Sequence, residues 1–300
     1  MFAAIDRQLT VDLGGRNVQP LYAAARNDEP LVAAAATPLF AAAAAGESVV
    51  LTTGFPIPPS NEPETDGPLG TVALAGALAD LGAKPVVVTE PRVEPAITAV
   101  ADALGVEPPE TVSLAPSDSA AAAKTARSLL DREPGAVVAV EKPGPTADGS
   151  YRTAAGEDIT ARVADIEPLF AAARERGIPT VGVGDGGNEV GMGVVQSAVE
   201  QHIDNGETIA CRTPVDALVV AGVSNWGAYG VVAALSLTAG RELLHTGPTE
   251  RELLAAAVEA GCIDGVTGEA TPSVDGIPGT IHADVVDLLG DICTTEIDTD

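Results

Sequence analysis

Six glycines and three polar side chains crowd into residues 181–193 of this chain. Asp185, Asn188 and Glu189 can accept protons or hydrogen bonds, and the glycines let the backbone approach a small ligand closely. The preceding residues 178–183 are predicted to form a short buried strand, so the cluster follows the carboxyl end of a strand. Open α/β sheets bind their ligands at that edge. A turn that only serves the fold needs one or two glycines, so the pattern favours a site over a structural turn.

Three further predicted strands, over residues 48–53, 135–140 and 217–221, also run into polar loops. The candidate residues in these loops are Thr53, Gly54, Thr65, Asp66, Gly67, Glu141, Lys142, Ser224 and Asn225. In a parallel sheet all four loops lie at one edge and can line a single crevice. This convergence is the basis of the predicted site.

The remaining pattern predicts an α/β protein in which strands alternate with helices. Further strands are expected over residues 85–89 and 111–114, with 208–211 as a weaker candidate. Helices are expected over residues 16–45 with a break at Pro38, and over 67–81, 93–104, 118–131, 166–176, 225–239, 249–260 and 283–289. Because the strands are continuous apolar runs, we expect a mostly parallel sheet with helices on both faces, a three-layer Rossmann-like arrangement. Without a repeat or a clear linker, residues 1–300 are expected to form a single α/β domain with a helical lead-in (1–45) and an acidic tail (291–300).

The chain is strongly acidic. It has 43 acidic against 16 basic residues, which gives a formal net charge of −27. The carboxylates are scattered along the chain, and such a surface stays hydrated in concentrated salt, where self-repulsion is screened. We therefore expect a halophilic protein that does not bind nucleic acid.

Cysteine usage and hydropathy indicate a cytoplasmic protein. Cys211, Cys262 and Cys293 are odd in number and contain no Cys-x-x-Cys pair, which argues against a disulfide framework and a zinc site. Asp6 interrupts any signal peptide. The apolar segment 31–45 is too short for a membrane span, so no membrane partner is expected.

Taken together, the loops resemble the D-glutamate cyclase family. The matching segments are Thr53-Gly54-Phe55, Glu64–Gly70, Gly184–Gly193 and Ser224–Gly227, and the resemblance runs from about Ile5 to about Pro278. Similar proteins convert D-glutamate to 5-oxo-D-proline and water, so the resemblance implies a carbon–oxygen lyase that acts on a small acidic amino acid. The chain departs from the family at Lys142, where arginine is expected; the charge is kept, but a forked contact to a carboxylate is lost.

Ring closure of D-glutamate requires a neutral amine that attacks the γ-carboxyl carbon and a proton donor for the departing oxygen. Positioned carboxyl groups can move both protons. From their positions, Asp185 or Glu189 is expected to be the general base and Asp66 the second acid–base group. Asp66 is equally well placed to cap the helix predicted at 67–81.

Backbone amides at predicted helix starts, after Gly67 and around Asn188, are expected to bind a substrate carboxylate. The other expected substrate-binding residues are Thr53, Gly54, Thr65, Lys142, Gly186, Gly187, Ser224 and Asn225. Lys142 has an exposed surface position as its alternative. No cofactor is required, because the chain has no Gly-Lys dipeptide and hence no phosphate loop. A divalent cation on Asp66, Asp185 and Glu189 is compatible with these residues.

Several nearby residues have simpler expected roles. Glu64 is expected to be a solvated loop charge, Tyr151 and Trp226 to serve packing, and His202 to be structural. The chain gives no direct indication of its oligomeric state, and a homo-oligomer is compatible with it.

Three other functions compete with the lyase. Residues 182–187 fit Gly-x-Gly-x-x-Gly, the fingerprint of an NAD-type oxidoreductase, but the match lies late in the chain and its carboxylates would repel a pyrophosphate. Residues 222–226 resemble a hydrolase nucleophile elbow, with Trp226 where glycine belongs. A non-catalytic amino-acid binding protein could use the same crevice. Product formation and NAD(H) titration separate these alternatives.

Overall fold

The structure, a computed structural model, describes residues 1–297. Within these residues six parallel strands form one sheet in the order β5-β4-β1-β6-β7-β8. The strands are β1 (Ser48–Thr52), β4 (Lys84–Thr89), β5 (Glu110–Ser113), β6 (Ala136–Val140), β7 (Thr180–Gly184) and β8 (Ala217–Val220). Along the chain, β4 and β5 are added on one side of β1. The chain then returns to the centre and adds β6, β7 and β8 on the other side. The topological switch point, where such sheets bind ligands, therefore lies between β1 and β6.

The central strands are buried on both faces. Every residue of β6, β7 and β8 is buried, and valine and alanine supply most of their side chains. Parallel sheets carry such continuous apolar runs because helices cover both of their faces. The predicted mostly parallel, three-layer α/β fold is thus confirmed.

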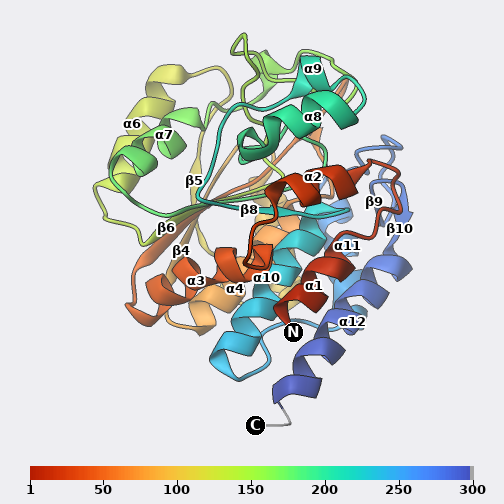
Figure 1. Cartoon of the computed structure of the whole chain (residues 1–300). Helices are drawn as coiled ribbons and strands as arrows, with labels where there is room; N and C mark the ends of the chain where they lie inside the picture. The colour runs from red at the N-terminus through yellow and green to blue at the C-terminus, as the bar shows by residue number, and fades with distance from the viewer. Residues whose placement is uncertain (298–300) are drawn as a thin grey trace.

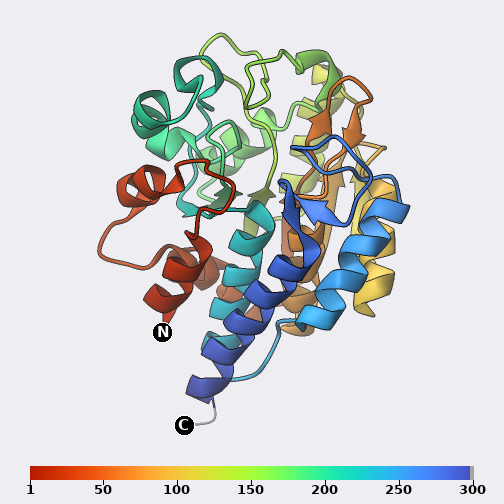
Figure 2. The same ribbon diagram turned by 90° about the vertical axis from the view of Figure 1, so that its right-hand side faces the viewer.

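The helices form a layer on each side of the sheet. Figure 1 shows α3 (Leu31–Ala44), α4 (Pro68–Asp80) and α10 (Ser224–Ala239) on one side and α6 (Ser119–Leu130) and α7 (Glu167–Glu175) on the other. The remaining helices are α1 (Phe2–Leu9), α2 (Val18–Ala25), α5 (Glu94–Leu104), α8 (Gln196–His202), α9 (Gly206–Ile209), α11 (Gly247–Glu259) and α12 (Gly279–Ile297). Figure 2 shows α11 and α12, in blue, side by side along one flank. Among the described residues, no helix has both the length and the apolar character that crossing a membrane requires.

Two short hairpins lie above the sheet and matter for the site. They pair β2 (Pro56–Ile57) with β3 (Glu62–Pro63), and β9 (Ser273–Val274) with β10 (Ile277–Pro278). Thr65 donates its hydroxyl hydrogen to the carbonyl of Ser273 at 2.8 Å, which ties the loop after β3 to the second hairpin. The C-terminal region thereby reaches the loop that follows β1.

Three expectations about secondary structure are wrong. Helix α3 continues through Pro38, because burial of side chains such as Leu39 compensates for the hydrogen bond that proline removes. Residues 208–211 form no strand and instead overlap helix α9, since a short apolar run does not distinguish the two structures. Residues 291–297 belong to α12, and residues 298–300 of the expected acidic tail lie outside the described residues.

Candidate active site

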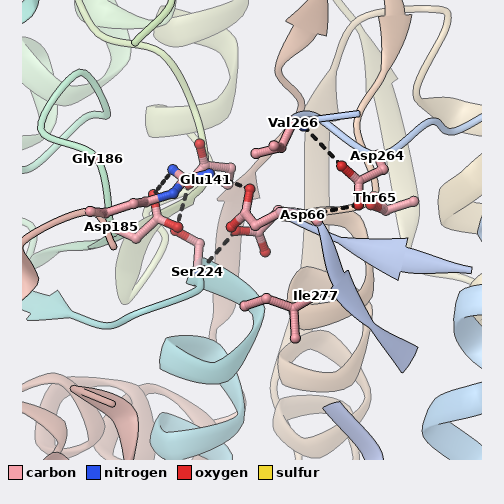
Figure 3. Close-up of polar contacts among 12 residues, drawn as sticks. Thr65, Asp66, Glu141, Asp185, Gly186, Ser224, Asp264, Val266 and Ile277 are labelled. Atoms are coloured by element: carbon pink, nitrogen blue, oxygen red, sulfur yellow. Dashed lines mark hydrogen bonds and ion pairs between the residues drawn. The ribbon is translucent and has the colours of Figure 1, made fainter. Parts of the chain in front are cut away.

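Four loops meet above the carboxyl ends of β1, β6, β7 and β8, which are neighbours in the sheet. Figure 3 shows Asp66, Glu141, Asp185 and Ser224, one from each loop, with their side chains directed toward one another. Carboxylate oxygens of Asp66, Glu141 and Asp185 all lie within 4.8 Å of one another. The convergence expected from the strand pattern is therefore present.

Asp66 is held by the start of α10. Its Oδ2 accepts the backbone N–H of Ser224 at 2.8 Å, and its Oδ1 accepts that of Asn225 at 2.7 Å. In return, Asn225 Oδ1 accepts the N–H groups of Gly67 and Gly70, at 2.9 and 2.8 Å, at the start of α4. Asp66 is not the N-cap of the helix that follows it, because Gly67 holds that position, although Asp66 Oδ1 accepts the N–H of Gly67 at 3.0 Å. Asn225 caps α4 more fully, and Asp66 caps α10.

Glu141 follows β6 directly and has a left-handed backbone, with φ of 43°. Its buried Oε2 accepts a hydrogen bond from Ser224 Oγ at 2.5 Å. A non-glycine residue in this conformation is uncommon and is a pointer to function. The sequence identified Glu141 as a candidate because it follows a predicted strand. It did not predict an acid–base role for Glu141 like those expected for Asp66 and Asp185.

The glycine cluster after β7 folds back on its own carboxylate. Glu189 Oε1 accepts the N–H of Gly186 at 2.7 Å, and Oε2 accepts that of Gly187 at 2.8 Å. Gly187 has φ of 102°, and a Cβ there would lie 2.6 Å from Val199, so only glycine fits the turn. Glu189 therefore shapes the loop and is a poorer candidate for the general base than Asp185.

Arg16, which sequence reasoning missed, enters the site from the segment between α1 and α2. Its Nη1 donates to Asp185 Oδ1 at 2.7 Å, and its Nη2 contacts Asp275 in the β9–β10 hairpin. Asp185 is fully buried and Asp275 nearly so. The only signal in the sequence is a Gly14-Gly15 turn before a basic residue, and the partners of Arg16 lie 169 and 259 residues away.

The buried environment of the acidic groups raises their pKa values and so favours their protonated forms. Burial raises the pKa of Asp66 to about 8, with the charge of Asp275 adding to the rise. Burial likewise raises the pKa of Glu141 and of Asp185 well above the ordinary range, even though Arg16 opposes the rise at Asp185. Carboxyl groups with raised pKa values can donate protons near neutral pH.

Glu64 is buried, so the expectation of a solvated loop charge is wrong. Its Oε1 has no hydrogen-bond partner among the described residues. Burial raises the pKa of Glu64 well above its usual value, and the charges of Asp275 and Asp66 add to the rise. Its backbone is fixed by a bridge to Ile263, which holds the side chain against the acidic group.

A cavity of about 300 Å³ opens above this group of carboxyl side chains. Its polar lining includes Arg16, Glu64, Glu141 and Asn188, and Phe55 is among its apolar residues. The size suits a small molecule, and the lining offers both acidic groups and one guanidinium. Asn188 donates its amide hydrogen to the carbonyl of Arg152 at 2.9 Å, which fixes it on the wall.

Several expected substrate-binding groups are already occupied. The amides of Gly67, Gly186 and Gly187 donate to Asn225 or Glu189 as described above. No helix begins at Asn188, because the turn is closed by the Glu189 carboxylate instead. The expectation that these amides bind a substrate carboxylate therefore lacks structural support.

Lys142 is buried rather than exposed and does not line the acidic cavity. Its ammonium group contacts the carboxylate of Glu90 and lies 3.4 Å from the carbonyl oxygen of Gly54. Gly54 and Glu90 line a second cavity, of about 290 Å³. Both Gly54 and Lys142 are thus at the expected edge of the sheet, but beside a different cavity.

The geometry also bears on the competing functions. The hydroxyl of Ser224 donates to Glu141, and none of the three histidines, all within the described residues, is its hydrogen-bond partner; His245 and His282 contact Glu250 and Trp226. A Ser-His nucleophile is therefore not assembled. In the Gly-x-Gly-x-x-Gly match over residues 182–187, Glu189 occupies the amides of Gly186 and Gly187 and no helix begins there, so the geometry disfavours dinucleotide binding as well.

Comparison with known proteins shows the family to which the chain belongs. A family model described as D-glutamate cyclase-like, C-terminal, matches residues 5–290. The chain is 34% identical over 285 residues to the mitochondrial D-glutamate cyclase of Homo sapiens, in an alignment that covers 83% of this chain and 46% of the human protein. The chain thus spans about half the length of the curated relative it matches.

Proposed function

The chain belongs to the D-glutamate cyclase-like family, and we propose that it is a lyase that cyclises D-glutamate to 5-oxo-D-proline with release of water. The observation that carries the proposal is the set of carboxyl groups on Asp66, Glu141 and Asp185, within 4.8 Å of one another. Glu141, one of the three, lines a cavity of about 300 Å³ together with Arg16. The guanidinium can pair with a substrate carboxylate, and the carboxyl groups can exchange protons with the substrate.

The reaction forms one C–N bond and breaks one C–O bond. The α-ammonium nitrogen loses two protons, attacks the γ-carboxyl carbon and becomes the lactam nitrogen. One γ-oxygen gains two protons and leaves as water. The net charge is unchanged, so the protein needs only to move protons and to stabilise the tetrahedral intermediate.

Asp185 and Asp66 are the acid–base groups in this proposal. Asp185 has one oxygen on Arg16, while its Oδ2 has no partner within residues 1–297. Burial and neighbouring carboxylates raise the pKa of both residues, so a proton is available for the departing oxygen. Such proton transfer contributes roughly 10²–10⁴-fold to a rate.

Arg16 is placed to neutralise a substrate carboxylate. Two of the five guanidinium N–H groups are used by Asp185 and Asp275, and the side chain lines the cavity. A neutralised γ-carboxylate is a better electrophile than a free one. Holding the substrate bent, with its amine against that carboxyl group, can contribute more than the proton transfers.

The test is the product. Full-length protein is incubated with D-glutamate or L-glutamate in molar salt, and 5-oxoproline is measured by chiral chromatography. We expect 5-oxo-D-proline from D-glutamate and little turnover of L-glutamate. Binding without product would indicate the amino-acid binder, and a change in NADH fluorescence on titration would indicate the oxidoreductase.

A further inference from the structure

We propose that Asp66, Glu141 and Asp185 bind one divalent cation of the Mg²⁺ or Mn²⁺ class through their carboxylate oxygens, and that this cation receives a carboxylate of the substrate. The second half rests on the proposed function, whereas the first half can be tested without it. The sequence allowed a cation on Asp66, Asp185 and Glu189. The structure changes that set by placing Glu141 in the group.

The spacing of the three carboxylates fits a cation. One oxygen from each lies within 4.8 Å of the others. Oxygens bound to one ion at about 2.1–2.5 Å are roughly 3–5 Å apart. The three residues come from the loops after β1, β6 and β7, so the fold itself holds the spacing.

Unpartnered oxygens are the second observation. Asp185 Oδ2 is fully buried and has no hydrogen-bond partner within residues 1–297. The same holds for Glu64 Oε1, on a side chain that lines the cavity beside Glu141, and for the hydroxyl of Thr53. Native structures leave few buried polar groups unsatisfied, and a bound ion is one of the explanations for those that remain.

Glu189 and Asp275 are not part of the ligand set. Both oxygens of Glu189 accept amides of its own loop. Asp275 pairs with Arg16 and leaves its Oδ2 without a hydrogen-bond partner among the described residues, but it lies outside the group whose carboxylate oxygens are within 4.8 Å of one another.

Asp66 Oδ1 accepts two N–H groups, from Gly67 and Asn225, whereas Oδ2 accepts only that of Ser224. A carboxylate oxygen has two lone pairs, so Oδ2 of Asp66 keeps one for an ion.

The charge balance favours a cation. When ionised, the three carboxylates carry a charge of −3, and Arg16, which also pairs with Asp275, offsets at most one of these charges. A divalent cation would displace the protons that burial otherwise favours, and Asp66 and Asp185 would then pass on protons taken from the substrate ammonium instead of donating their own. Buried charges are costly unless they are paired or coordinate a metal. A substrate with two carboxylates would bind poorly beside uncompensated acids, so the same ion would also make the cavity accessible to it.

The donor atoms determine the class of ion. All three are carboxylate oxygens, and no histidine or cysteine belongs to this described group. Oxygen donors suit Mg²⁺, Mn²⁺ and Ca²⁺, whereas zinc sites in proteins use mainly nitrogen and sulfur. Three protein ligands leave positions open for substrate or water.

Binding can be measured directly with Mn²⁺ as the probe. Chelator-treated full-length protein is titrated with Mn²⁺ by calorimetry, and free Mn²⁺ is followed by electron paramagnetic resonance. We expect one ion per chain and a rise in the thermal unfolding midpoint, since a ligand that binds the folded state stabilises it. Absence of saturable binding at millimolar Mn²⁺ would overturn the proposal.

Variants locate the ion. Loss of an outer-shell partner alone costs roughly 10–100-fold in metal affinity, so Glu141→Gln and Asp185→Asn should each weaken Mn²⁺ binding by at least about tenfold. Glu167→Gln is the matched control, because that partly buried carboxyl contacts Thr213 away from the cavity. Circular dichroism identifies any variant that fails to fold. Equal affinity in folded Glu141→Gln and Asp185→Asn variants and the wild type would also overturn the assigned ligands.

Turnover separates this proposal from the proposed function. Mn²⁺ binding without conversion of D-glutamate would refute the cyclase while the ion site stands. Conversion at full rate in chelator-treated protein would refute the role of the ion in receiving substrate. Loss of conversion on chelation and its recovery with Mn²⁺ would support both.

Discussion

Asp66 and Asn225 each cap the helix that begins beside the other residue. The Asp66 carboxylate accepts the N–H groups of Ser224 and Asn225 at the start of α10, and the Asn225 side chain accepts those of Gly67 and Gly70 at the start of α4. The two segments are 159 residues apart in the chain. This reciprocal capping fixes the loop after β1 against the loop after β8, and so positions Asp66 beside Glu141 and Asp185.

Replacement of Asn225 should therefore reduce stability. Asn225→Ala removes one acceptor from two buried amides, and loss of an N-cap costs about 0.5–2 kcal/mol, with more where buried groups are left unpaired. We expect the free energy of unfolding in urea to fall by about 2 kcal/mol. Asn27→Ala is the control, since exposed Asn27 accepts a single N–H within its own turn. Equal losses in both variants would contradict the reciprocal capping.

Asp185→Asn should abolish turnover while the fold is retained. The amide keeps the shape and can still face Arg16, but it can neither donate a proton to the departing oxygen nor accept one from the substrate amine. Loss of an acid–base group lowers a rate by roughly 10²–10⁴-fold. Initial rates of 5-oxoproline formation, with circular dichroism as a check on folding, give the answer, and Glu167→Gln serves as a control away from the cavity. Wild-type rates in Asp185→Asn would remove this residue from the mechanism.

The stability of cation-free protein should fall as pH rises. Burial raises the pKa of Asp66 from its ordinary value of 3.8 to about 8, and raises the pKa of Glu141 and Asp185 well above the usual range. Between those values the folded state binds more protons than the unfolded state, so stability is lost as pH increases through the window. Burial lowers the pKa of His282 from its ordinary value of 6.5, so this residue adds stability as pH rises toward 6.5 and opposes the loss only in the acidic part of the window.

Urea unfolding across a pH series measures this effect. The same series with saturating Mn²⁺ is the control, and it should show a weaker dependence, because the ion stabilises the ionised carboxylates. A free energy of unfolding that increases from weakly acidic pH to about 8 in chelator-treated protein would contradict the assignment of raised pKa values.

Salt should stabilise the protein. The chain carries a formal net charge of −27, and self-repulsion between exposed carboxylates is screened as ionic strength rises. We expect the thermal unfolding midpoint and the turnover rate to increase from dilute buffer toward molar potassium chloride. An equal concentration of sucrose would control for effects that do not depend on charge. Maximal stability in dilute buffer would refute the expected adaptation to salt.

Features that depend on local pattern were predictable from the sequence. Continuous apolar runs such as residues 136–140 identify strands buried on both faces, and the glycines after β7 identify a tight loop at the edge of the sheet. Once the sheet is taken as parallel, the meeting of Asp66, Asp185 and Asn225 follows from topology. These residues do lie together in the structure.

Features that depend on distant partners were not predictable. Arg16 belongs to the site only because the segment after α1 passes beside Asp185 and Asp275, and nothing in the local sequence states this. Glu64 is buried because the C-terminal region covers it through its bridge to Ile263. Both carboxylate oxygens of Glu189 accept N–H groups of its own loop, and these contacts depend on the backbone conformation of that turn, which the sequence does not give.

The central claim is that the acidic cavity removes one γ-oxygen of D-glutamate as water while the amine closes the ring. D-glutamate labelled with ¹⁸O at both γ-oxygens, incubated with the protein and analysed by mass spectrometry, tests it most directly. We predict 5-oxo-D-proline that retains one labelled oxygen, with labelled water released in equal amount and neither product formed by Asp185→Asn. Unreacted D-glutamate with the wild type, or a product that retains no label, would contradict the account.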